Sequence, residues 1–567
     1  MANHLYYGDN LEVLRQHIRD ESVDLVYLDP PFNSNATYNV LFRGPSGDAS
    51  QAQIEAFEDT WHWNNAAEKA FDEVMQGPNS DVAEMLRAMR SFLKDNDMMA
   101  YLTHMAVRLV ELHRVLKPTG SIYLHCDPTA SHYLKVLMDA VFGKEQFRNE
   151  IIWRRTGSHN STKRYGPIHD AILFFVKSGT FRFNRLIRPY MRGHVEKAFV
   201  KEGDRYRTNY SGNVLTGSGT RNGESGQPWQ GFDPTSKGRH WALPGKLLEG
   251  IEDQFDGLTQ HQKFSKLLEM GLVNIKGGDE WPTYQRYLTA QDGQYLSDIW
   301  AYQPYTENTV FGTTDGIDDD VRWMGSKDGD RLGYPTQKPV ALLERILAAS
   351  SNPGDVVLDP FCGCGTTVHA AEKLGRQWIG IDITHLSISL IEKRLKDAFP
   401  GIKFEVHGAP KDLEGARDLS NRDKYQFQWW AVSLVDAVPF GGKKKGADGG
   451  IDGHIFFKSG AKTTEKAIVS VKGGGVGVTN IRELTAVVDR ERAKIGVYIS
   501  LEAHTRPMVE EAAGAGLYDG PTGKVPKIQL FTIEELFAGK KPQIPLMERG
   551  FKAAAREKRD DQSDLDL

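Results

Sequence analysis

Residues Val357–Thr367 read VLDPFCGCGTT, and this stretch decides the fold class. An apolar strand leads into a turn of small residues and then into a helix, and Gly363 and Gly365 allow the backbone to approach a ligand closely. Asp382 lies 19 residues after Gly363, at the end of the next expected strand, where a carboxylate can accept hydrogen bonds from ribose hydroxyls. The pattern is neither G-x-G-x-x-G nor a P-loop. It therefore predicts an α/β fold that binds a nucleoside cofactor rather than a dinucleotide.

Strand and helix signals alternate on both sides of this stretch. Apolar runs predict strands at 22–28, 121–125, 171–176, 356–359 and 377–382. Apolar spacing and flanking prolines predict helices at 102–116, 133–141 and 339–349. Alternation of this kind predicts a doubly wound, Rossmann-like parallel sheet with helices on both faces.

The same rhythm predicts the domain borders. It fades over a long glycine-rich segment without clear periodicity, which we interpret as an inserted domain. The borders are expected at 1–177 and 331–410 for the α/β domain, 178–330 for the insertion, 411–424 for a charged linker, 425–540 for a separate α+β unit and 550–567 for a disordered tail. A chain of 567 residues agrees with three or four domains.

Composition excludes several classes of protein. With 40% hydrophobic and 26% charged residues, the chain is too apolar to be largely disordered. Charged residues interrupt every apolar run before the ~18 residues that a membrane span needs, and the N-terminus lacks a signal-peptide pattern. Three cysteines cannot form a disulfide framework, and Cys362 and Cys364 have no further Cys or nearby His to complete a metal site. We expect a reducing, cytoplasmic compartment and no bound metal at this turn.

Charge is distributed unevenly along the chain. The net charge is −5, yet residues 151–240 carry 16 Lys and Arg against 6 Asp and Glu, a local balance of +10. A basic segment with interleaved aromatic residues, inside an otherwise acidic chain, predicts a face that binds a polyanion. Arg154, Arg155, Lys163 and Arg164 are the candidate phosphate contacts.

A second motif, Asp29-Pro30-Pro31-Phe32, follows the apolar run at 22–28. The Asp29 carboxylate and the Pro30 carbonyl, stiffened by the two prolines, offer two acceptors that match the two donors of an exocyclic amino group. The ring of Phe32 can stack on the heterocycle that carries this group. Such a site draws the amino nitrogen toward tetrahedral geometry and exposes its lone pair for attack on a methyl sulfonium.

Together the two motifs resemble those of the S-adenosylmethionine-dependent DNA amino-methyltransferases. Asp29–Phe32 matches their catalytic (D/N/S)PP(Y/F) motif, and Asp359–Gly365 resembles their FxGxG cofactor motif. The catalytic motif comes first and a large insertion separates the two, which is the circularly permuted order of the beta class that includes type III modification subunits. The resemblance covers residues 1–177 and 331–410, and the insertion at 178–330 falls where the family carries its target-recognition domain.

The resemblance implies roles for individual residues. The implied catalytic residues are Asp29, Pro30, Pro31 and Phe32. The implied cofactor-binding residues are Asp9, Lys338, Asp359, Phe361, Gly363, Gly365 and Asp382. Within this set Asp382 takes the ribose, Asp9 lies near the cofactor adenine, and Lys338 belongs to the flanking cofactor helix. The Phe361-to-Gly365 turn lines the methionine part.

The resemblance also implies a substrate and partners. The target base must leave double-stranded DNA to reach the site, so base flipping is implied. Asp-Pro-Pro is more typical of adenine-N6 enzymes, and an N4-cytosine enzyme is the alternative. A prokaryotic or phage host, a homodimer and a restriction partner are the remaining expectations.

The C-terminal unit resembles Mrr-like members of the PD-(D/E)xK nuclease fold, through Gly446–Gly453, the strand at 467–472 and the helix after it. Asp452 and Lys472 match the nuclease motif, but Ser470 stands where a Glu or Gln is expected, and Ser is a poor ligand for Mg²⁺. Asp448 is a substitute whose direction is not fixed. A degenerate DNA-binding or structural module is therefore favoured. A fused restriction-modification enzyme with a Mg²⁺-dependent nuclease is the alternative, and the intact methyltransferase motifs argue against a scaffold without catalysis.

Overall fold

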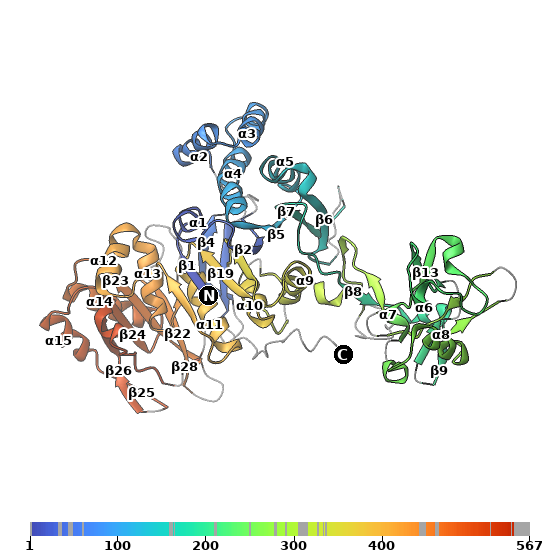
Figure 1. The fold of residues 1–567 in the computed structure, drawn as a ribbon. Coiled ribbons are helices and arrows are strands. Elements are labelled where there is room, and N and C mark those ends of the chain that lie inside the picture. Colours follow the sequence, from blue (N-terminus) through green and yellow to red (C-terminus); the bar gives the residue numbers. More distant parts are fainter. Residues whose placement is uncertain are drawn as a thin grey trace. The chain divides into compact units, whose positions relative to one another are not determined.

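The computed structural model describes residues 3–31, 37–43, 49–58, 62–157, 163, 165–203, 205–208, 213–248, 251–276, 280–289, 292–303, 316–325, 328–332, 334, 337–440, 450–459, 464–521, 523–545 and 547–548. The chain forms two compact units (Figure 1). Unit 1 comprises Met1–Asn184, Asp298–Tyr302 and Asp320–Asp566, and unit 2 comprises Arg185–Ser297 and Gln303–Asp319. Among the described helices, none is both long enough and apolar enough to cross a membrane.

The described residues of unit 1 contain a nine-stranded sheet with the order β17-β6-β7-β5-β2-β18-β19-β1-β20. Its strands are β1 (Asn3–Tyr7), β2 (Val23–Leu28), β5 (Leu116–Cys126), β6 (Phe147–Arg154), β7 (His169–Val176), β17 (Ile299–Trp300), β18 (Val356–Asp359), β19 (Gln377–Asp382) and β20 (Phe404–His407). Neighbouring strands are parallel, except that β7 runs antiparallel to both β5 and β6. The expected doubly wound α/β sheet is confirmed.

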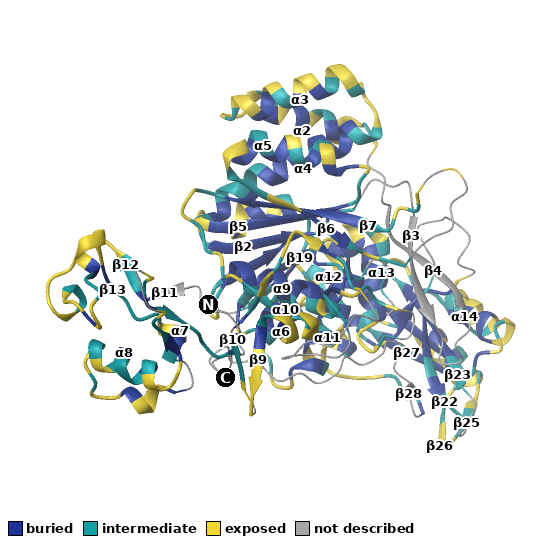
Figure 2. Ribbon diagram, turned by 90° about the vertical axis from the view of Figure 1, so that its right-hand side faces the viewer, coloured by how far each residue is buried: buried dark blue, intermediate teal, exposed yellow. Residues whose placement is uncertain are grey.

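Helices cover both faces of this sheet, because its strands alternate apolar side chains between two cores. Val26 and Leu28 lie in one core, whereas Leu25 and Tyr27 lie in the other. The first core packs α1 (Asn10–His17), α2 (Asn65–Gln76), α3 (Ser80–Leu93), α4 (Asp97–Val115) and α5 (Ser131–Phe142). The second core packs α9 (Val340–Ser350), α10 (Thr366–Lys373) and α11 (His385–Ala398). Figure 2 shows the central strands as buried between these helices.

Two features of unit 1 were not anticipated from the sequence. The strand β6 extends the sheet beyond β7, so the segment expected to begin a basic surface is part of the sheet. The helices α2 and α3 precede α4, and the chain also forms a hairpin of β3 (Thr37–Arg43) and β4 (Ala49–Glu58).

The inserted segment is shorter than the expected 178–330, because β17 pairs with β6 and the chain from Asp320 onward belongs to unit 1.

Unit 2 is built from short elements around an aromatic core. Its strands are β8 (Ile187–Pro189), β9 (Phe199–Glu202), β10 (Arg205–Thr208), β11 (Asn213–Val214), β12 (Thr216–Ser218), β13 (Arg239–Trp241), β14 (Val273–Asn274), β15 (Thr283–Tyr284) and β16 (Gly293–Tyr295), and its α-helices are α6 (Arg192–Ala198), α7 (Gly245–Leu248) and α8 (Gln260–Glu269). Trp229 and Trp241 pack edge to face with ring centroids 5.8 Å apart, and Phe264 lies against both rings. Aromatic packing thus replaces regular periodicity, which explains why the sequence pattern gave no clear elements here.

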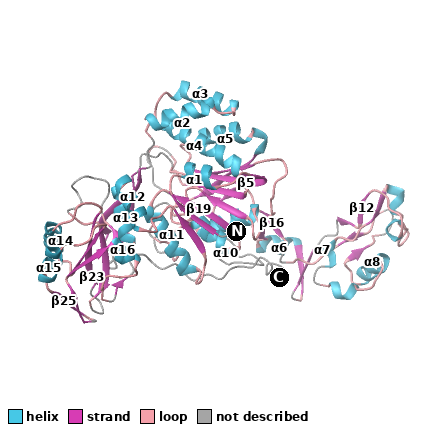
Figure 3. Ribbon diagram, turned by 60° about the vertical axis from the view of Figure 1, so that its left-hand side comes forward, coloured by secondary structure: helices cyan, strands magenta, loops and turns pink. Residues whose placement is uncertain are grey.

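The C-terminal part of unit 1 has its own mixed sheet (Figure 3). Its strands are β21 (Val438–Pro439), β22 (Gly453–Lys458), β23 (Thr464–Lys472), β24 (Ile495–Ser500), β27 (Ile528–Thr532) and β28 (Met547–Glu548), with a separate hairpin of β25 (Leu517–Gly520) and β26 (Gly523–Pro526). Its helices are α12 (Leu413–Arg422), α13 (Lys424–Ser433), α14 (Val478–Arg490), α15 (Arg506–Gly514) and α16 (Ile533–Phe537).

The charged segment at 411–424 is not a linker. It forms α12, whose first turn is capped by the Asp412 side chain accepting a hydrogen bond from the Gly415 amide at 2.8 Å. Ala416 and Leu419 are buried in the same core as α13 and β23. The charges lie on the outer face of an amphipathic helix, and the expectation of a linker mistook that face for an unstructured connection.

Candidate active site

Four aspartates lie at the carboxyl ends of four neighbouring strands. Asp9 follows β1, Asp29 follows β2, and Asp359 and Asp382 end β18 and β19. The strand order β2-β18-β19-β1, with all neighbours parallel, brings these ends to one edge of the sheet. Open α/β sheets bind their ligands outside this edge. The fold therefore places the catalytic motif beside the cofactor motif, although the insertion separates them in sequence.

The turn after β18 is held by a carboxylate on each side. Oδ1 of Asp359 accepts a hydrogen bond from the Phe361 amide at 3.0 Å, and Oδ2 of Asp382 accepts one from the Gly363 amide at 2.9 Å. Thr384 donates its amide and its hydroxyl to the other oxygen of Asp382, at 2.9 and 3.0 Å. The two carboxylates thus fix the backbone of the cofactor motif from both neighbouring strands.

The two glycines of this turn serve different needs. Gly363 has φ +50° and Gly365 has φ +76°, which are conformations that residues with a side chain rarely adopt. A Cβ on Gly365 would lie only 2.8 Å from Cγ1 of Ile391, so this glycine permits close packing of α11. A Cβ on Gly363 would lie 3.4 Å from the ring of Tyr334, which is ordinary contact. Both glycines are therefore required by the backbone conformation, and Gly365 is also required by the close packing of α11.

Burial makes the carboxylates of the cofactor motif weak acids. It raises the pKa of Asp359 to about 7 and that of Asp382 to about 6, and hydrogen bonds from Thr367 and the Phe361 amide to Asp359 offset only part of this effect. The negative charges of Asp29 and Asp382 raise the pKa of Asp359 further. A group of carboxylates of low exposure at a ligand-binding edge favours a ligand that carries positive charge and hydrogen-bond donors.

Asp9 supports the turn through a second network. Its Oδ1 caps α1 by accepting the Leu11 amide at 2.8 Å, and its Oδ2 lies 3.0 Å from Nη2 of the buried Arg108. Arg108 also donates to Asn10 at 2.6 Å, and Asn10 donates to the carbonyl of Pro360 at 2.8 Å. The expected cofactor residue Asp9 is thus linked by hydrogen bonds to the turn of the cofactor motif.

Asp29 of the catalytic motif forms an ion pair with Lys338, a residue expected to belong to the cofactor helix. Nζ of Lys338 donates a hydrogen bond to Oδ2 of Asp29 in an ion pair that is largely buried on both sides. Lys338 directly precedes the N-cap of α9, so the expectation that it belongs to the flanking cofactor helix named the right segment but not this contact. Phe32 lies outside the described residues.

A buried polar chain lies behind Asp29, on residues that the motifs do not include. The hydroxyl of Tyr27 lies 2.8 Å from Nδ1 of His125, and Nε2 of His125 lies 3.1 Å from Oδ2 of Asp170. Nε of Arg155 lies 3.3 Å from the other oxygen of Asp170. The hydrogen bond and the positive charges of His125, Lys338 and Arg155 outweigh burial and lower the pKa of Asp170. The pair His169-Asp170, present in the sequence, was the available signal for this network.

The residues expected to contact DNA differ in their surroundings. The guanidinium of Arg154 lies 4.9 Å from the ring centre of Trp323, and Arg155 is engaged by Asp170. Lys163 is exposed, and Arg164 lies outside the described residues. The guanidinium of Arg155 is paired with Asp170 but its side chain stays 39% exposed, so contact of Arg154 and Arg155 with phosphate stays a prediction.

Three of the candidate nuclease residues, Asp452, Ser470 and Lys472, lie in the described part of the C-terminal domain. Asp452 precedes β22 and lies across from Ser470 on β23, as the register pair Gly453 and Val469 shows, and Lys472 ends β23. Oδ2 of Asp452 already accepts the Val471 amide at 2.7 Å. Asp448 lies outside the described residues, and within those residues Asp452 joins no group of three His, Cys, Asp or Glu side chains with ligand atoms in reach of one ion.

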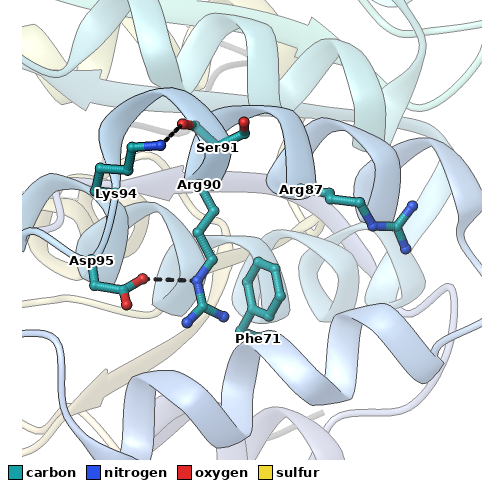
Figure 4. A pocket seen from close by; sticks show the side chains of 6 residues that line it. All are labelled: Phe71, Arg87, Arg90, Ser91, Lys94 and Asp95. Atoms are coloured by element: carbon teal, nitrogen blue, oxygen red, sulfur yellow. Dashed lines mark hydrogen bonds and ion pairs between the residues drawn. The ribbon is translucent and has the colours of Figure 1, made fainter.

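A surface hollow of about 430 Å³ lies on α2 and α3 (Figure 4). It is lined by Phe71, Arg87, Arg90, Ser91, Lys94 and Asp95. The central Arg90 donates to both oxygens of Glu68 at 2.9 Å and to Asp95 at 2.8 Å, so its charge is already compensated. No residue of the two motifs lines this hollow, and we do not assign it to the active site.

Three methyltransferases or methyltransferase subunits are among the known proteins with segments similar to this chain. The chain is 29% identical over 302 residues to the type II methyltransferase M.EcaI of Enterobacter cloacae, covering 52% of this chain and 57% of that protein. It is 46% identical over 308 residues to the type II methyltransferase M.HpaI of Haemophilus parainfluenzae, covering 54% and 63%. It is 25% identical over 379 residues to the Mod subunit of the type III restriction-modification enzyme StyLTI of Salmonella typhimurium, covering 65% and 50%. The chain spans less than two thirds of each relative.

Two family models match separate parts of the chain. Residues 420–538 match a restriction endonuclease model of the Mrr catalytic type, which confirms an Mrr-like C-terminal domain. Residues 23–393 match a DNA methylase model, over a range that includes the Asp29 motif, the insertion and the Asp359 motif. That match spans more than half of the chain, and the chain therefore belongs to the DNA methylase family.

Proposed function

We propose that this chain transfers a methyl group from S-adenosylmethionine to the exocyclic N6 of an adenine flipped out of double-stranded DNA, at a specific sequence. One observation carries the proposal. Asp29 of the catalytic motif and Asp359 and Asp382 of the cofactor motif lie at adjacent carboxyl ends of one sheet. A base amino group held at the first motif and a methyl donor held at the second would therefore meet.

Asp29 and Pro30 hold the amino group in this proposal. The carboxylate and the proline carbonyl accept its two hydrogens, which draws the nitrogen lone pair out of conjugation with the base. The ion pair with Lys338 supports this role, because it fixes the direction of the Asp29 carboxylate before the base arrives. Stacking of the base on Phe32, with Pro31 as the rigid spacer, stays a prediction.

The carboxylates at this edge of the sheet fit the hydrogen-bond donors and the positive charge of S-adenosylmethionine. The cofactor supplies an electrophilic methyl group on a sulfonium, and it also carries an ammonium group and ribose hydroxyls. The pKa values of the buried Asp359 and the half-buried Asp382 are raised, and the positive charge and hydrogen-bond donors of the cofactor would stabilise their ionised carboxylates. In this arrangement Asp382 accepts from the ribose, and the turn from Phe361 to Gly363 lies along the methionine part.

The polar chain behind the catalytic motif supports a positioning role. Tyr27 lies on β2 two residues before Asp29, which directly follows that strand, and burial together with the charge of Asp29 raises the pKa of Tyr27. The hydrogen bonds through His125 to Asp170 hold the ends of β2, β5 and β7 together beneath the site. We propose that these residues position Asp29 and do not touch the base.

Recognition of DNA is assigned to unit 2 and to the exposed basic residues near β6. Flipping a base requires a grip on the flanking phosphates, which Lys163 and the neighbouring Arg164 could supply. Unit 2 would read the sequence, since its place in the chain is that of the target-recognition domain. Both assignments are part of the proposal, as are a homodimer and a restriction partner.

The choice of adenine rests on the motif alone. Asp-Pro-Pro at the catalytic position is more typical of adenine-N6 enzymes than of cytosine-N4 enzymes. The two bases present the same kind of amino group to the two acceptors, so an N4-cytosine enzyme is the alternative within the same mechanism.

For the C-terminal domain we propose a DNA-binding or structural role without cleavage. The support comes from the described candidate residues. Asp452 is the one among them with a carboxylate, one oxygen of which accepts the Val471 amide, and Ser470 stands where the nuclease motif has a Glu or Gln. Mg²⁺ binds through carboxylates and water, and this set offers it little. The match to the restriction endonuclease model favours the alternative, a fused restriction-modification enzyme.

The proposed function is tested with the purified full chain, tritiated S-adenosylmethionine and mixed-sequence duplex DNA. We expect label in DNA that migrates as N6-methyl-2′-deoxyadenosine after digestion to nucleosides. Asp29→Ala should abolish the label while calorimetry shows that S-adenosylmethionine still binds, because Asp29 contacts the base and not the cofactor. Near-normal labelling by Asp29→Ala would overturn the catalytic assignment, and label in N4-methylcytosine would select the alternative base.

A further inference from the structure

Two histidines and a glutamate converge on the last two strands of the nine-stranded sheet, outside the candidate active site. His4 lies on β1, and Glu405 and His407 lie on β20. The parallel register pairs His4 with Glu405 and Tyr6 with His407. Residues two apart along a strand share a face, so the His4, Glu405 and His407 side chains lie on one face of the sheet.

The nitrogen and oxygen atoms of this group have the spacing of metal ligands. Nδ1 of His4 is 3.0 Å from Nε2 of His407, and Oε2 of Glu405 is 3.8 Å from the first nitrogen and 3.5 Å from the second. In a tetrahedral Zn²⁺ site with bonds of ~2.0–2.1 Å, neighbouring ligand atoms lie ~3.3–3.4 Å apart. The three observed separations bracket that value. In the part of the chain that the structure describes, no other group of three His, Cys, Asp or Glu side chains meets the same spacing.

The imidazole of His407 is held in place by stacking. The ring of Tyr6, which is 8% exposed, lies parallel to it with centroids 4.6 Å apart, and His17 of α1 stacks on Tyr6 at 5.4 Å. The side chains of His4 and His407 are 27% and 31% exposed and that of Glu405 is 60% exposed, so an ion can reach them from solvent.

We propose that His4, Glu405 and His407 bind a divalent transition-metal ion of the Zn²⁺ class, with water in the fourth position. Two imidazole nitrogens and a carboxylate oxygen form a ligand set that Zn²⁺ uses in proteins. Without the ion, the two imidazoles share a hydrogen bond.

The site would act as a clip at the edge of the sheet. Within the described residues β20 pairs with β1 alone, and the chain then turns at Gly408 toward α12. Gly408 has φ +80°, and a Cβ there would lie 2.1 Å from the Tyr7 carbonyl oxygen, so β20 leaves β1 abruptly. An ion bound to both strands would hold the edge strand where the chain leaves the methylase sheet for the C-terminal domain.

The proposal is tested on the full chain without an affinity tag, after treatment with EDTA. Zn²⁺ is titrated in competition with a chromophoric chelator, and Co²⁺ binding is followed by its visible d–d absorption. We expect one equivalent of Zn²⁺ to bind, a tetrahedral Co²⁺ spectrum, and a Tm that rises with Zn²⁺. His4→Gln and His407→Gln should each weaken Zn²⁺ binding at least tenfold and abolish the Tm rise.

Three controls make the result decisive. His17→Gln leaves the three ligands intact and should bind Zn²⁺ within twofold of the wild type. Asp452→Asn should also bind normally, which separates this site from the C-terminal domain. Circular dichroism of each metal-free variant checks that it is folded. Equal Zn²⁺ binding by the wild type and His407→Gln, or none by either, would overturn the proposal and leave only a hydrogen-bonded histidine pair. Neither result depends on methylation.

Discussion

Replacing Asp359 with Asn should stabilise the unliganded protein, and the gain should grow with pH. Burial raises the pKa of Asp359 from its ordinary value of 3.8 to about 7. A carboxyl group with a raised pKa contributes stability that is fully present below its unfolded pKa and is lost as the pH rises through its folded pKa. The wild type therefore carries an increasing cost between about pH 4 and pH 7.

The magnitude follows from that shift. A difference of about three pKa units corresponds to about 4 kcal/mol of folding free energy at pH 8, and to about 1–2 kcal/mol at pH 5. Asn has no charge to bury, and its Oδ1 can keep the hydrogen bond from the Phe361 amide, which is 3.0 Å long in the wild type. Asp359→Asn should therefore gain roughly 2–4 kcal/mol at pH 8 and much less at pH 5. The rate of methyl transfer by Asp359→Asn should fall, because we expect the Asp359 carboxylate, whose charge destabilises the folded protein, to interact with the cofactor.

The assay is urea unfolding of the wild type and Asp359→Asn at pH 5 and pH 8, without ligand. Asp72→Asn, at an exposed position of α2, is the matched control and should change stability by less than ~0.5 kcal/mol at either pH. The reasoning is refuted if Asp359→Asn is no more stable than the wild type at pH 8, or if its gain is the same at both pH values.

Three further predictions concern single residues. Gly365→Ala should lower stability more than Gly363→Ala, since only the new Cβ at position 365 would clash with Ile391, at 2.8 Å. Gly363→Ala should mainly weaken S-adenosylmethionine binding. Urea unfolding and calorimetry separate the two effects, and equal losses of stability would contradict the assignment. Lys163→Gln should reduce the slope of log DNA affinity against log salt concentration by about 1. Arg155→Gln should lower stability with little change in that slope. A reduced slope for Arg155→Gln and an unchanged slope for Lys163→Gln would place Arg155 on the DNA. The full chain should not cut unmethylated DNA with Mg²⁺ or Mn²⁺, and Lys472→Ala should methylate normally; metal-dependent cutting that Lys472→Ala loses would make this a fused restriction-modification enzyme.

The sequence predicts those parts of the fold that depend on local pattern. The strands that end at Asp359 and Asp382 are short, apolar and followed by turn residues, so both the strands and their carboxyl ends could be named. The strand β6 was missed because only one of its faces is apolar: Ile151 and Trp153 are buried, while Glu150 on the opposite face is exposed. Strands of this kind depend on a neighbour that the local sequence does not reveal.

In the candidate site, too, the sequence predicts what lies within one local segment and does not predict contacts between distant segments. The turn of the cofactor motif was predictable, because its glycines and aspartates lie within one strand-turn-helix and the next strand. The contact of Lys338 with Asp29 and that of Arg155 with Asp170 were not, since each joins segments that only the folded sheet brings together. Charge counting named Arg155 as a phosphate contact without showing that its guanidinium also pairs with Asp170, because a count of charges does not show which charges are paired within the protein.

The central claim is that the Asp29 motif methylates a base amino group in DNA. The most direct test is single-molecule methylome sequencing of DNA from cells that express the wild type or Asp29→Ala, in a host without its own methyltransferases. The account predicts N6-methyladenine at one recurring sequence motif with the wild type and none with Asp29→Ala. Unmodified DNA from cells with the soluble wild type, or the same methylation pattern with Asp29→Ala, would contradict it.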